Sequence, residues 1–203
     1  GTHVASICAG NTETNYTGIA PNTGIYDLCV QSTAIESGLF FIQDALRWIS
    51  VFAKEYNIQV VNLSLGGKRP WGDTENIINS IIEQDIFVVA ATGNEQHVEN
   101  VDDSEYIGYP SGYPNVIAIG SLGRLNEQNN IDYTVTSYYS EVGNNIDYTS
   151  PGRNIIAAKS MTEEDTIVLS GTSMACPYAA GIITLLVSYL KTNEILPSNC
   201  VQR

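Results

Sequence analysis

The sequence has few basic residues: nine Lys and Arg stand against 22 Asp and Glu, which gives a formal net charge of −13 over 203 residues. Such an acidic chain repels phosphate backbones and anionic lipid, and no Lys- or Arg-rich run offsets that repulsion locally. Long apolar runs are lacking too, because stretches such as Ile182–Val187 fall far below the roughly 18 residues that cross a bilayer. We therefore expect no nucleic-acid partner and no membrane association.

Cysteine is scarce as well, and the residues are far apart in the sequence, with no CxxC pair and no Cys/His cluster at zinc spacing: Cys8, Cys29, Cys176 and Cys200. This spacing argues against a structural metal site on sulfur. Cys8 and Cys29 stand among apolar neighbours. We therefore expect them to be buried, reduced thiols that pack as small hydrophobic groups.

The chain does contain enough apolar residues, 43%, to bury a core, and we assign residues 1–203 to a single domain. Apolar residues alternate between helical spacing and short continuous runs. This pattern predicts helices at the start of the chain and at 40–56 and 75–84, and strands at 25–30, 58–65, 86–91 and 116–119. Strands that are apolar throughout are buried on both faces by crossover helices, which predicts an α/β fold with a mostly parallel sheet.

The last third of the chain follows a different pattern. From Ile131 to Leu169 short runs with tyrosines alternate with turn-prone Asn and Gly, which predicts a local antiparallel excursion. Residues 172–190 are apolar around most of a helical circumference, so we expect a buried helix there. Pro177 falls in its first turns, where a missing N–H costs least.

A serine, Ser173, stands at the predicted start of that helix, directly after the strand-like residues 167–169. Free backbone N–H groups and the positive end of the helix dipole favour negative charge there, which suits a hydroxyl that attacks a carbonyl. A serine in this place is also an ordinary helix N-cap. The position alone leaves both interpretations open.

Two strand ends are candidates for the rest of a site. Asn94 follows the apolar run 86–91, so it is expected at the carboxyl end of a strand, where an amide can hold an oxyanion. Asn after Gly is equally a plain turn. Asn62–Gly67 also ends a buried strand in glycines, and its backbone can pair with an extended peptide.

Taken together, these segments and several others stand in an order that closely resembles the subtilisin-like serine proteases. They are Gly1–Ala5, Gly18–Pro21, Asn62–Gly67, Gly93–Glu95, Gly108–Pro110, Tyr113–Ala118, Ser150–Gly152 and Gly171–Ala175. The resemblance runs from Gly1 to about Gln202, and Gly171–Ala175 followed by Cys-Pro is its most specific part. It implies a three-layer subtilisin-like fold with a mostly parallel central sheet flanked by helices.

The resemblance implies a serine endopeptidase that hydrolyses peptide bonds through an acyl-enzyme on Ser173, without a cofactor. Asn94 and the backbone N–H of Ser173 would form the oxyanion hole, with Thr172 and Met174 supporting them. Donors already aimed at the developing oxyanion lower the barrier without reorganising. A catalytically dead relative that binds peptide as a scaffold or regulator is the alternative.

The resemblance also implies where a polypeptide substrate would lie. Backbone rails would flank the substrate strand beside an apolar wall, and a roomy primary pocket would favour large apolar side chains, with an acid at its rim that admits Lys or Arg. The residues that it implies are Ser64, Leu65 and Gly66 with Ser37 and Gly38 for the rails, Phe40 for the wall, Ala91, Gly93 and Gly108 for the pocket, and Glu95 for the rim.

The catalytic histidine and aspartate are not matched. The family places the His immediately before the Gly-Thr-His run and the Asp in an earlier strand, so both would lie upstream of Gly1. We expect this chain to be incomplete at its N-terminus and to need that segment as a partner, because an unpaired strand edge destabilises the fold and a serine needs a base. His3 would lie about 5–6 Å from the absent His at Cβ, too far to replace it. His97 is expected in a solvated loop.

Two weak calcium sites complete the expectations. One is the loop 11–17, whose single acid is Glu13. The other uses carbonyls near Ser111, Tyr113 and Val116 with Asp147. Calcium takes six to eight oxygens, so we regard structural calcium as optional. The resemblance implies secretion, and the cytosol is the alternative location.

Overall fold

Helices and strands alternate along the computed structural model, which describes residues 1–11, 17–30, 38–95, 107–160 and 165–193. The helices are α1 Thr2–Ala9, α2 Gly38–Phe52, α3 Thr74–Ile82 and α4 Thr172–Thr192. The strands are β1 Val60–Leu63, β2 Phe87–Ala91, β3 Ile117–Leu125, β4 Ile131–Thr136, β5 Tyr148–Pro151, β6 Ile155–Ala158 and β7 Thr166–Leu169. The predicted helices and the later three of the four predicted parallel strands are confirmed, with boundaries that move by a few residues.

The main sheet is mostly parallel. β1, β2 and β3 lie side by side in parallel, with Val61 opposite Val88 and Ala90 opposite Ala118, and β5 pairs in parallel with β3. β4 pairs antiparallel with the end of β3, and β6 and β7 form a separate antiparallel pair. The predicted antiparallel excursion is therefore confirmed for β4, β6 and β7, whereas β5, which lies in the same range, joins the parallel part of the sheet.

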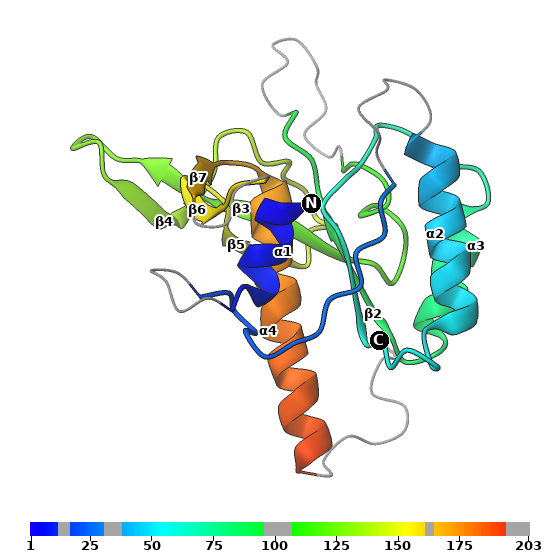
Figure 1. The fold of residues 1–203 in the computed structure, drawn as a ribbon. Coiled ribbons are helices and arrows are strands. Elements are labelled where there is room, and N and C mark those ends of the chain that lie inside the picture. The colour runs from blue at the N-terminus through cyan, green and yellow to red at the C-terminus, as the bar shows by residue number, and fades with distance from the viewer. Residues whose placement is uncertain (12–16, 31–37, 96–106, 161–164, 194–203) are drawn as a thin grey trace.

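Side chains of β2 divide the core into two layers, because successive residues of a strand point to opposite faces. Val88 and Ala90 belong to the apolar cluster under α2 and α3, whereas Val89 and Ala91 belong to the cluster under α4. In Figure 1, α2 and α3 lie on one side of the sheet, and α1 and α4 lie on the other. The molecule thus has three layers, helices, sheet and helices.

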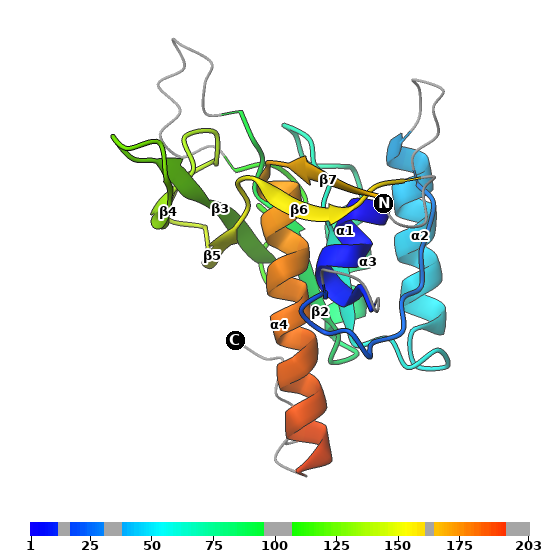
Figure 2. The same cartoon turned by 60° about the vertical axis from the view of Figure 1, so that its left-hand side comes forward.

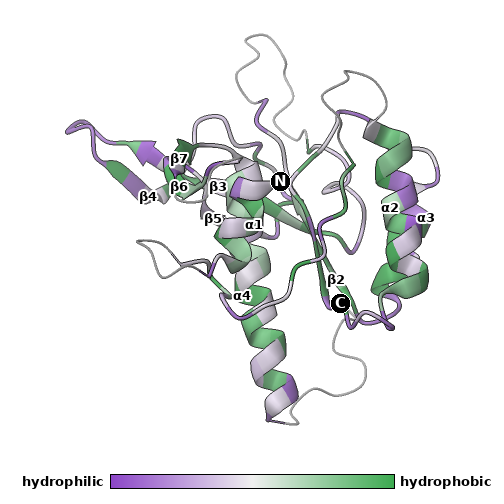
Figure 3. Ribbon diagram, viewed as in Figure 1, coloured by the Kyte–Doolittle hydropathy of each residue, from purple (hydrophilic) through white to green (hydrophobic). Residues whose placement is uncertain are grey.

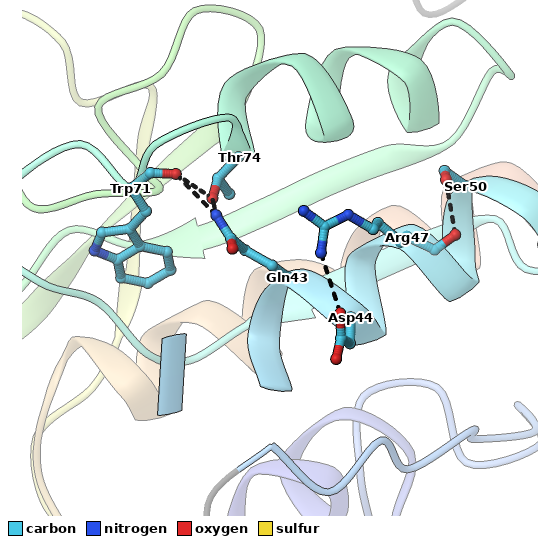
Figure 4. A network of polar contacts seen from close by, with 6 residues as sticks. All are labelled: Gln43, Asp44, Arg47, Ser50, Trp71 and Thr74. Carbon is cyan, nitrogen blue, oxygen red and sulfur yellow. Dashed lines mark hydrogen bonds and ion pairs between the residues drawn. The ribbon is translucent and has the colours of Figure 1, made fainter. Parts of the chain in front are cut away.

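The α2–α3 layer is joined by polar contacts as well as by its core. Ile42, Leu46 and Ile49 recur at helical spacing on the buried face of α2. At the other end of the interface, Gln43 Nε2 donates to Thr74 Oγ1 at 2.9 Å and to the carbonyl of Trp71 at 3.2 Å (Figure 4). These bonds fix the loop that leads into α3, whose apolar residues complete the layer.

On the opposite face, α1 and α4 pack together under the β6–β7 pair (Figure 2). Ser6 Oγ accepts the backbone N–H of Ala158 at 3.0 Å, and Met174 packs against Ile7 and Ala157. The sequence predicted a buried helix here, and that is confirmed for the first half of α4 and, in its second half, for Val187. Apolar side chains of its second half are exposed, and the apolar colouring continues along it in Figure 3: Ile182, Leu185, Leu186 and Tyr189.

α4 also has the length and composition that a membrane-spanning helix needs, although 44% of its most apolar window is buried inside the molecule. Its contacts with β1, β2, β3 and β5 are those of a core helix. A soluble core helix passes the same test of length and composition. The expected absence of a membrane partner stays a prediction.

The predicted strand at 25–30 does not form. These residues pair with none of the described strands. The sheet ends on that side at β1, the last described strand. Leu28 and Val30 still pack against the core under α2, whereas Ile25 and Tyr26 are about half exposed. An apolar run becomes a strand only when a neighbour satisfies its backbone hydrogen bonds, and none of the described strands pairs with this one.

The cysteines correct a second expectation. Cys29 is exposed and Cys8 is half-buried, so the predicted burial fails for the first and holds in part for the second. Cys176 is fully buried. Cys200 lies outside the described residues. Apolar neighbours in sequence did not imply burial for Cys29, because the segment that carries it pairs with no strand.

Candidate active site

Three backbone segments meet at the carboxyl ends of the parallel strands. β1 and β2 are parallel, so their carboxyl ends lie on the same side, and the loops that follow them start there. α4 begins at the same end of the sheet, because Thr172 contacts the loop after β2 and Ser173 contacts the segment after β1. This convergence brings together residues that are far apart in sequence.

Ser173 lies half-buried in the first turn of α4. Its hydroxyl donates to the carbonyl oxygen of Ser64 at 3.2 Å. Ser64 lies just beyond the last paired residue of β1, and its own hydroxyl accepts the side-chain amide of Asn62 at 3.0 Å. The serine that the sequence singles out is therefore next to the predicted substrate rail.

Asn94 is held by Thr172, the residue before Ser173. The amide oxygen Oδ1 accepts the backbone N–H of Thr172 at 2.8 Å and its hydroxyl at 3.0 Å. Because a backbone N–H can only donate, the atom that faces Thr172 is the oxygen. The NH₂ group of this exposed side chain is thus the donor that remains for a ligand.

Two positions around this loop leave little room for a side chain, and both are glycines. Gly93 has φ +118°, and a Cβ there would lie 3.1 Å from Cγ of Glu141. Its N–H donates to Thr172 Oγ1 at 3.3 Å. Gly108 donates its N–H to the carbonyl of Thr92 at 2.9 Å, and a Cβ on it would lie 2.9 Å from that oxygen. Both positions keep the loop after β2 tightly packed.

The rail after β1 is tied to the segment that contains Gly108. Gly67 and Tyr109 exchange two backbone hydrogen bonds, of 2.9 and 2.8 Å. A Cβ on Gly66 would lie 3.2 Å from the Tyr109 carbonyl. Ser64, Leu65 and Gly66 therefore lie between the end of β1 and this bridge, close to Ser173.

A charged pair lies at the predicted pocket rim. Glu95 Oε2 is 2.7 Å from Nζ of Lys68, and both side chains are about half exposed. An exposed pair of this kind stabilises the fold by at most about 1 kcal/mol. It does, however, place a positive charge against the acid that the resemblance assigned to basic substrates.

The sequence analysis missed one residue of this site, Glu141. Its side chain is 3% exposed, and its carboxylate oxygen Oε1 accepts the backbone N–H of Glu95 at 2.9 Å. Its own N–H donates to the carbonyl of Gly93 at 3.3 Å. An acid between Ser140 and Val142, in a region of turns, gives no sign in the sequence that it is buried.

Cys176 lies one turn into α4, three residues after Ser173. Burial raises the pKa of its thiol to about 12, although hydrogen bonds with the Ser64 side chain and the Leu63 backbone act in the opposite direction. The group is therefore a neutral thiol at neutral pH, and thiolate chemistry is not available to it.

The described part of the chain brings no histidine to Ser173. His3 is buried in α1, and its Nε2 lies 3.2 Å from the Ile155 carbonyl and 3.1 Å from the Ile167 carbonyl. Those carbonyls belong to β6 and β7. His3 is thus a structural residue of the α1 layer, in line with the expectation that it does not serve as the base. His97 lies outside the described residues.

Other predicted site residues lie further from this convergence. Met174 points into the cluster with Ile7 and Ala157. Phe40 lies on α2 with 72% of its surface exposed, and Gly38 is the first residue of that helix. Ser37 is outside the described residues. Their assigned roles stay predictions.

The calcium candidates find few ligands. Of the first loop, Glu13 lies outside the described residues. In the second, Asp147 Oδ2 accepts the N–H of Ala118 at 2.9 Å, the Ser111 hydroxyl donates to the Gly108 carbonyl, and the Tyr113 carbonyl accepts the Val116 N–H at 3.3 Å. Within the described ranges, no cluster of three or more acidic, His or Cys side chains could hold a metal. Calcium takes six to eight oxygens, and structural calcium at either place stays a prediction.

Known proteins are similar to this chain in sequence. Subtilisin NAT of Bacillus subtilis subsp. natto is 31% identical over 192 residues, which cover 93% of this chain and 45% of the relative. The major intracellular serine protease of Bacillus subtilis strain 168 is 30% identical, with 93% and 55% covered. The chain spans about half the length of the curated relatives that it matches.

Solved structures agree with the sequence relatives. A cold adapted subtilisin-like serine proteinase matches with a TM-score of 0.74 and 25% identity over 98% of this chain and 64% of its own. The self-cleaved protease domain of PatA matches with a TM-score of 0.75 and 25% identity, over 97% and 69%. The model of the subtilase family, peptidase S8, matches residues 1–201. The chain therefore belongs to the subtilase family and has its α/β fold, with a mostly parallel sheet between layers of helices.

Proposed function

We propose that this chain is the larger part of a serine endopeptidase domain, in which Ser173 attacks the carbonyl of a peptide bond. The observation that carries the proposal is the contact between the two halves of the site. Thr172 fixes the amide oxygen of Asn94, and the next residue is the candidate nucleophile. The Asn94 NH₂ group and the Ser173 N–H are then the two donors that face a developing oxyanion.

The chemistry follows from these groups. Ser173 Oγ forms a bond to the substrate carbonyl carbon and loses its proton to a base, and the carbonyl oxygen becomes the oxyanion that the two donors hold. The base returns the proton to the leaving amine when the peptide bond breaks. Water then attacks the acyl-enzyme by the same route and releases Ser173.

The base and its orienting acid are proposed to come from sequence upstream of Gly1. In this structure Ser173 Oγ donates to the Ser64 carbonyl, so its proton has no basic side chain to accept it among the described residues. Two features of β1 support the proposal: β1 is the last strand on its side of the described sheet, and the side-chain oxygen Oδ1 of Asn62 on this strand is buried without a hydrogen-bond donor in the described part of the chain. A further strand between β1 and residues 25–30 would supply backbone N–H groups to this edge.

For the substrate, we propose an extended polypeptide that pairs with the backbone of Ser64–Gly66. The pocket beside Ala91, Gly93 and Gly108 is proposed to take a large apolar side chain. The ion pair between Glu95 and Lys68 supports this choice over a basic side chain, because the rim acid is already neutralised. A peptide library with varied residues before the cleaved bond would measure the preference.

The test is covalent labelling of the full-length protein with a fluorophosphonate, followed by peptide mapping. We expect the label on Ser173, and we expect it to disappear in Ser173→Ala but to remain in Ser188→Ala, which changes an exposed serine on the same helix. A folded full-length protein that takes no label at Ser173 would overturn the endopeptidase proposal.

A second function stands on one observation, the hydrogen bond from the Ser173 hydroxyl to a backbone carbonyl instead of to a base. It is a catalytically inactive subtilase that binds peptides along Ser64–Gly66. The two functions differ in a direct experiment: an inactive binder retains an unlabelled peptide without cleaving it, and either the His expected before Gly1 or the Asp expected further upstream is then replaced.

Location and metal dependence are proposed separately from the site. We propose secretion, with the cytosol as the alternative, and one relative is by name intracellular. Fractionation of the producing cells decides between them. Calcium is proposed to be dispensable, and the unfolding temperature of the full-length protein with calcium or with a chelator measures this.

A further inference from the structure

We propose that Glu141 is a positioning residue of the oxyanion hole, which fixes the backbone on both sides of Asn94 and thereby aims its NH₂ group. The proposal rests on the proposed function, because it assigns a residue to the same reaction. The resemblance in sequence assigned nothing to Glu141. Its role comes from its contacts.

Glu141 contacts the two neighbours of Asn94 in the chain. Its backbone N–H donates to the Gly93 carbonyl at 3.3 Å, and its carboxylate Oε1 accepts the Glu95 N–H at 2.9 Å. Its Cγ also lies 3.1 Å from the place where a Cβ on Gly93 would be. Glu141 therefore fixes both peptide groups that flank Asn94, the one before it and the one after it.

Asn94 needs such support because burial does not position it. The residue is exposed, and the bonds of its side chain are those from Thr172 to Oδ1. Thr172 fixes the amide at one end, and Glu141 fixes the backbone at the other. With both ends held, the direction of the NH₂ group is set before a substrate arrives, which is what an oxyanion hole requires.

The support is connected to the centre of the sheet. Ser121 of β3 donates its N–H to Ser140 Oγ at 2.9 Å, and its carbonyl accepts the Ser137 N–H at 2.8 Å. The Ser140 N–H in turn donates to the Ser137 carbonyl at 3.0 Å. Glu141 follows directly, so the loop that carries Asn94 is fixed to a buried strand.

The choice of an acid at this place also needs a reason. A carboxylate that is 3% exposed is costly to bury unless it is hydrogen-bonded, and an apolar side chain would fill the same space without that cost. The bond to the Glu95 N–H explains why an acceptor is present. A neutral side chain of the same length with an acceptor oxygen should then also accept the Glu95 N–H.

The experiment measures kcat and KM separately in the full-length protease. Glu141→Leu removes the acceptor, and Glu141→Asp draws it back by one methylene from the Glu95 N–H; we expect both to lower kcat about 10–100-fold with KM changed less than about threefold. Glu141→Gln keeps an oxygen that accepts the Glu95 N–H, and kcat should stay within about threefold. Glu127→Leu, which removes an exposed acid between β3 and β4, is the matched control.

A double-mutant cycle with Asn94→Ala separates positioning from general destabilisation. If Glu141 acts through Asn94, Glu141→Leu should lower kcat by less than about threefold further once the amide is gone. A full additional loss in that background, or unchanged kcat in all of the Glu141 variants, would contradict the proposal. If Glu141→Leu does not fold, Glu141→Asp carries the same comparison.

Failure of the proposed function gives a different result. An inactive binder leaves Ser173 unlabelled by fluorophosphonate in the unmodified protein, and no kcat exists to compare. A labelled, active protein whose turnover ignores Glu141 overturns this inference alone.

Discussion

The two halves of the candidate site differ in how completely this chain builds them. On the oxyanion side, Asn94 is held through its side chain by Thr172 and through its backbone by Glu141, with hydrogen bonds of 2.8–3.3 Å. On the nucleophile side, Ser173 makes one weak bond to a backbone carbonyl at 3.2 Å. The donors proposed for charge stabilisation are in place, whereas the described residues bring no side chain to Ser173 that could take its proton.

The difference follows from the order of the strands. The oxyanion side uses the loop after β2 and residues 137–141, which are hydrogen-bonded to β3, and both β2 and β3 are interior strands of the described sheet. The nucleophile side opens toward β1, the last strand on that edge. A site at the edge of a sheet depends on whatever covers the edge, and a site among central strands does not.

The largest effect should come from the oxyanion side itself. Asn94→Ala in the full-length protease should lower kcat about 10²–10³-fold, the loss that subtilisin shows when it loses such a donor, with little change in KM. Steady-state kinetics on a peptide substrate measure it. Unchanged turnover would remove Asn94 from the mechanism and reverse the comparison between the two halves.

A smaller effect should follow when one hydrogen bond from Thr172 to Asn94 is removed and the Asn94 amide is kept. Thr172→Val deletes the hydroxyl that donates to Asn94 Oδ1 and accepts the Gly93 N–H, but it keeps the backbone N–H bond. We expect kcat to fall about tenfold, the equivalent of one hydrogen bond. Thr166→Val, at an exposed position on β7, should leave kcat unchanged, and equal losses in both variants would contradict this role.

The smallest effect concerns the free energy of unfolding alone and comes from Cys176, three residues after Ser173 on α4. Burial raises the pKa of the Cys176 thiol from 9.0 to about 12, so the folded chain holds this proton more tightly than the unfolded chain. The free energy of unfolding should therefore be unaffected by this group below pH 9 and should fall as pH rises from 9 toward 12. Urea unfolding at several pH values should show a shallower decline in Cys176→Ala, and identical slopes would contradict the assignment.

Much of the fold could be predicted from the sequence because the signals are local. Continuous apolar runs mark β1 and β2, and helical spacing marks α2, α3 and α4. The run at 25–30 carries the same signal but forms no strand, since a strand is a property of a pair of segments. The exposed end of α4 is a similar case, because apolar residues indicate what can be buried and not what covers them.

The site divides in the same way. Ser173 and Asn94 could be identified because they stand in specific motifs at a helix start and a strand end. Glu141 could not, since its importance lies in contacts with Gly93 and Glu95, which are more than 40 positions away in the sequence. No local pattern distinguishes a buried acid of this kind from a solvated one.

The exposed apolar side chains at the end of α4 have a consequence for how the chain behaves in solution. Its net charge of −13 keeps molecules apart at low ionic strength, when electrostatic repulsion extends beyond the height of a side chain. At 1 M salt that repulsion reaches only about 3 Å, and apolar patches on separate molecules can then meet. Solubility should therefore decrease as salt is added, and dilute buffer is the medium in which this chain stays dispersed.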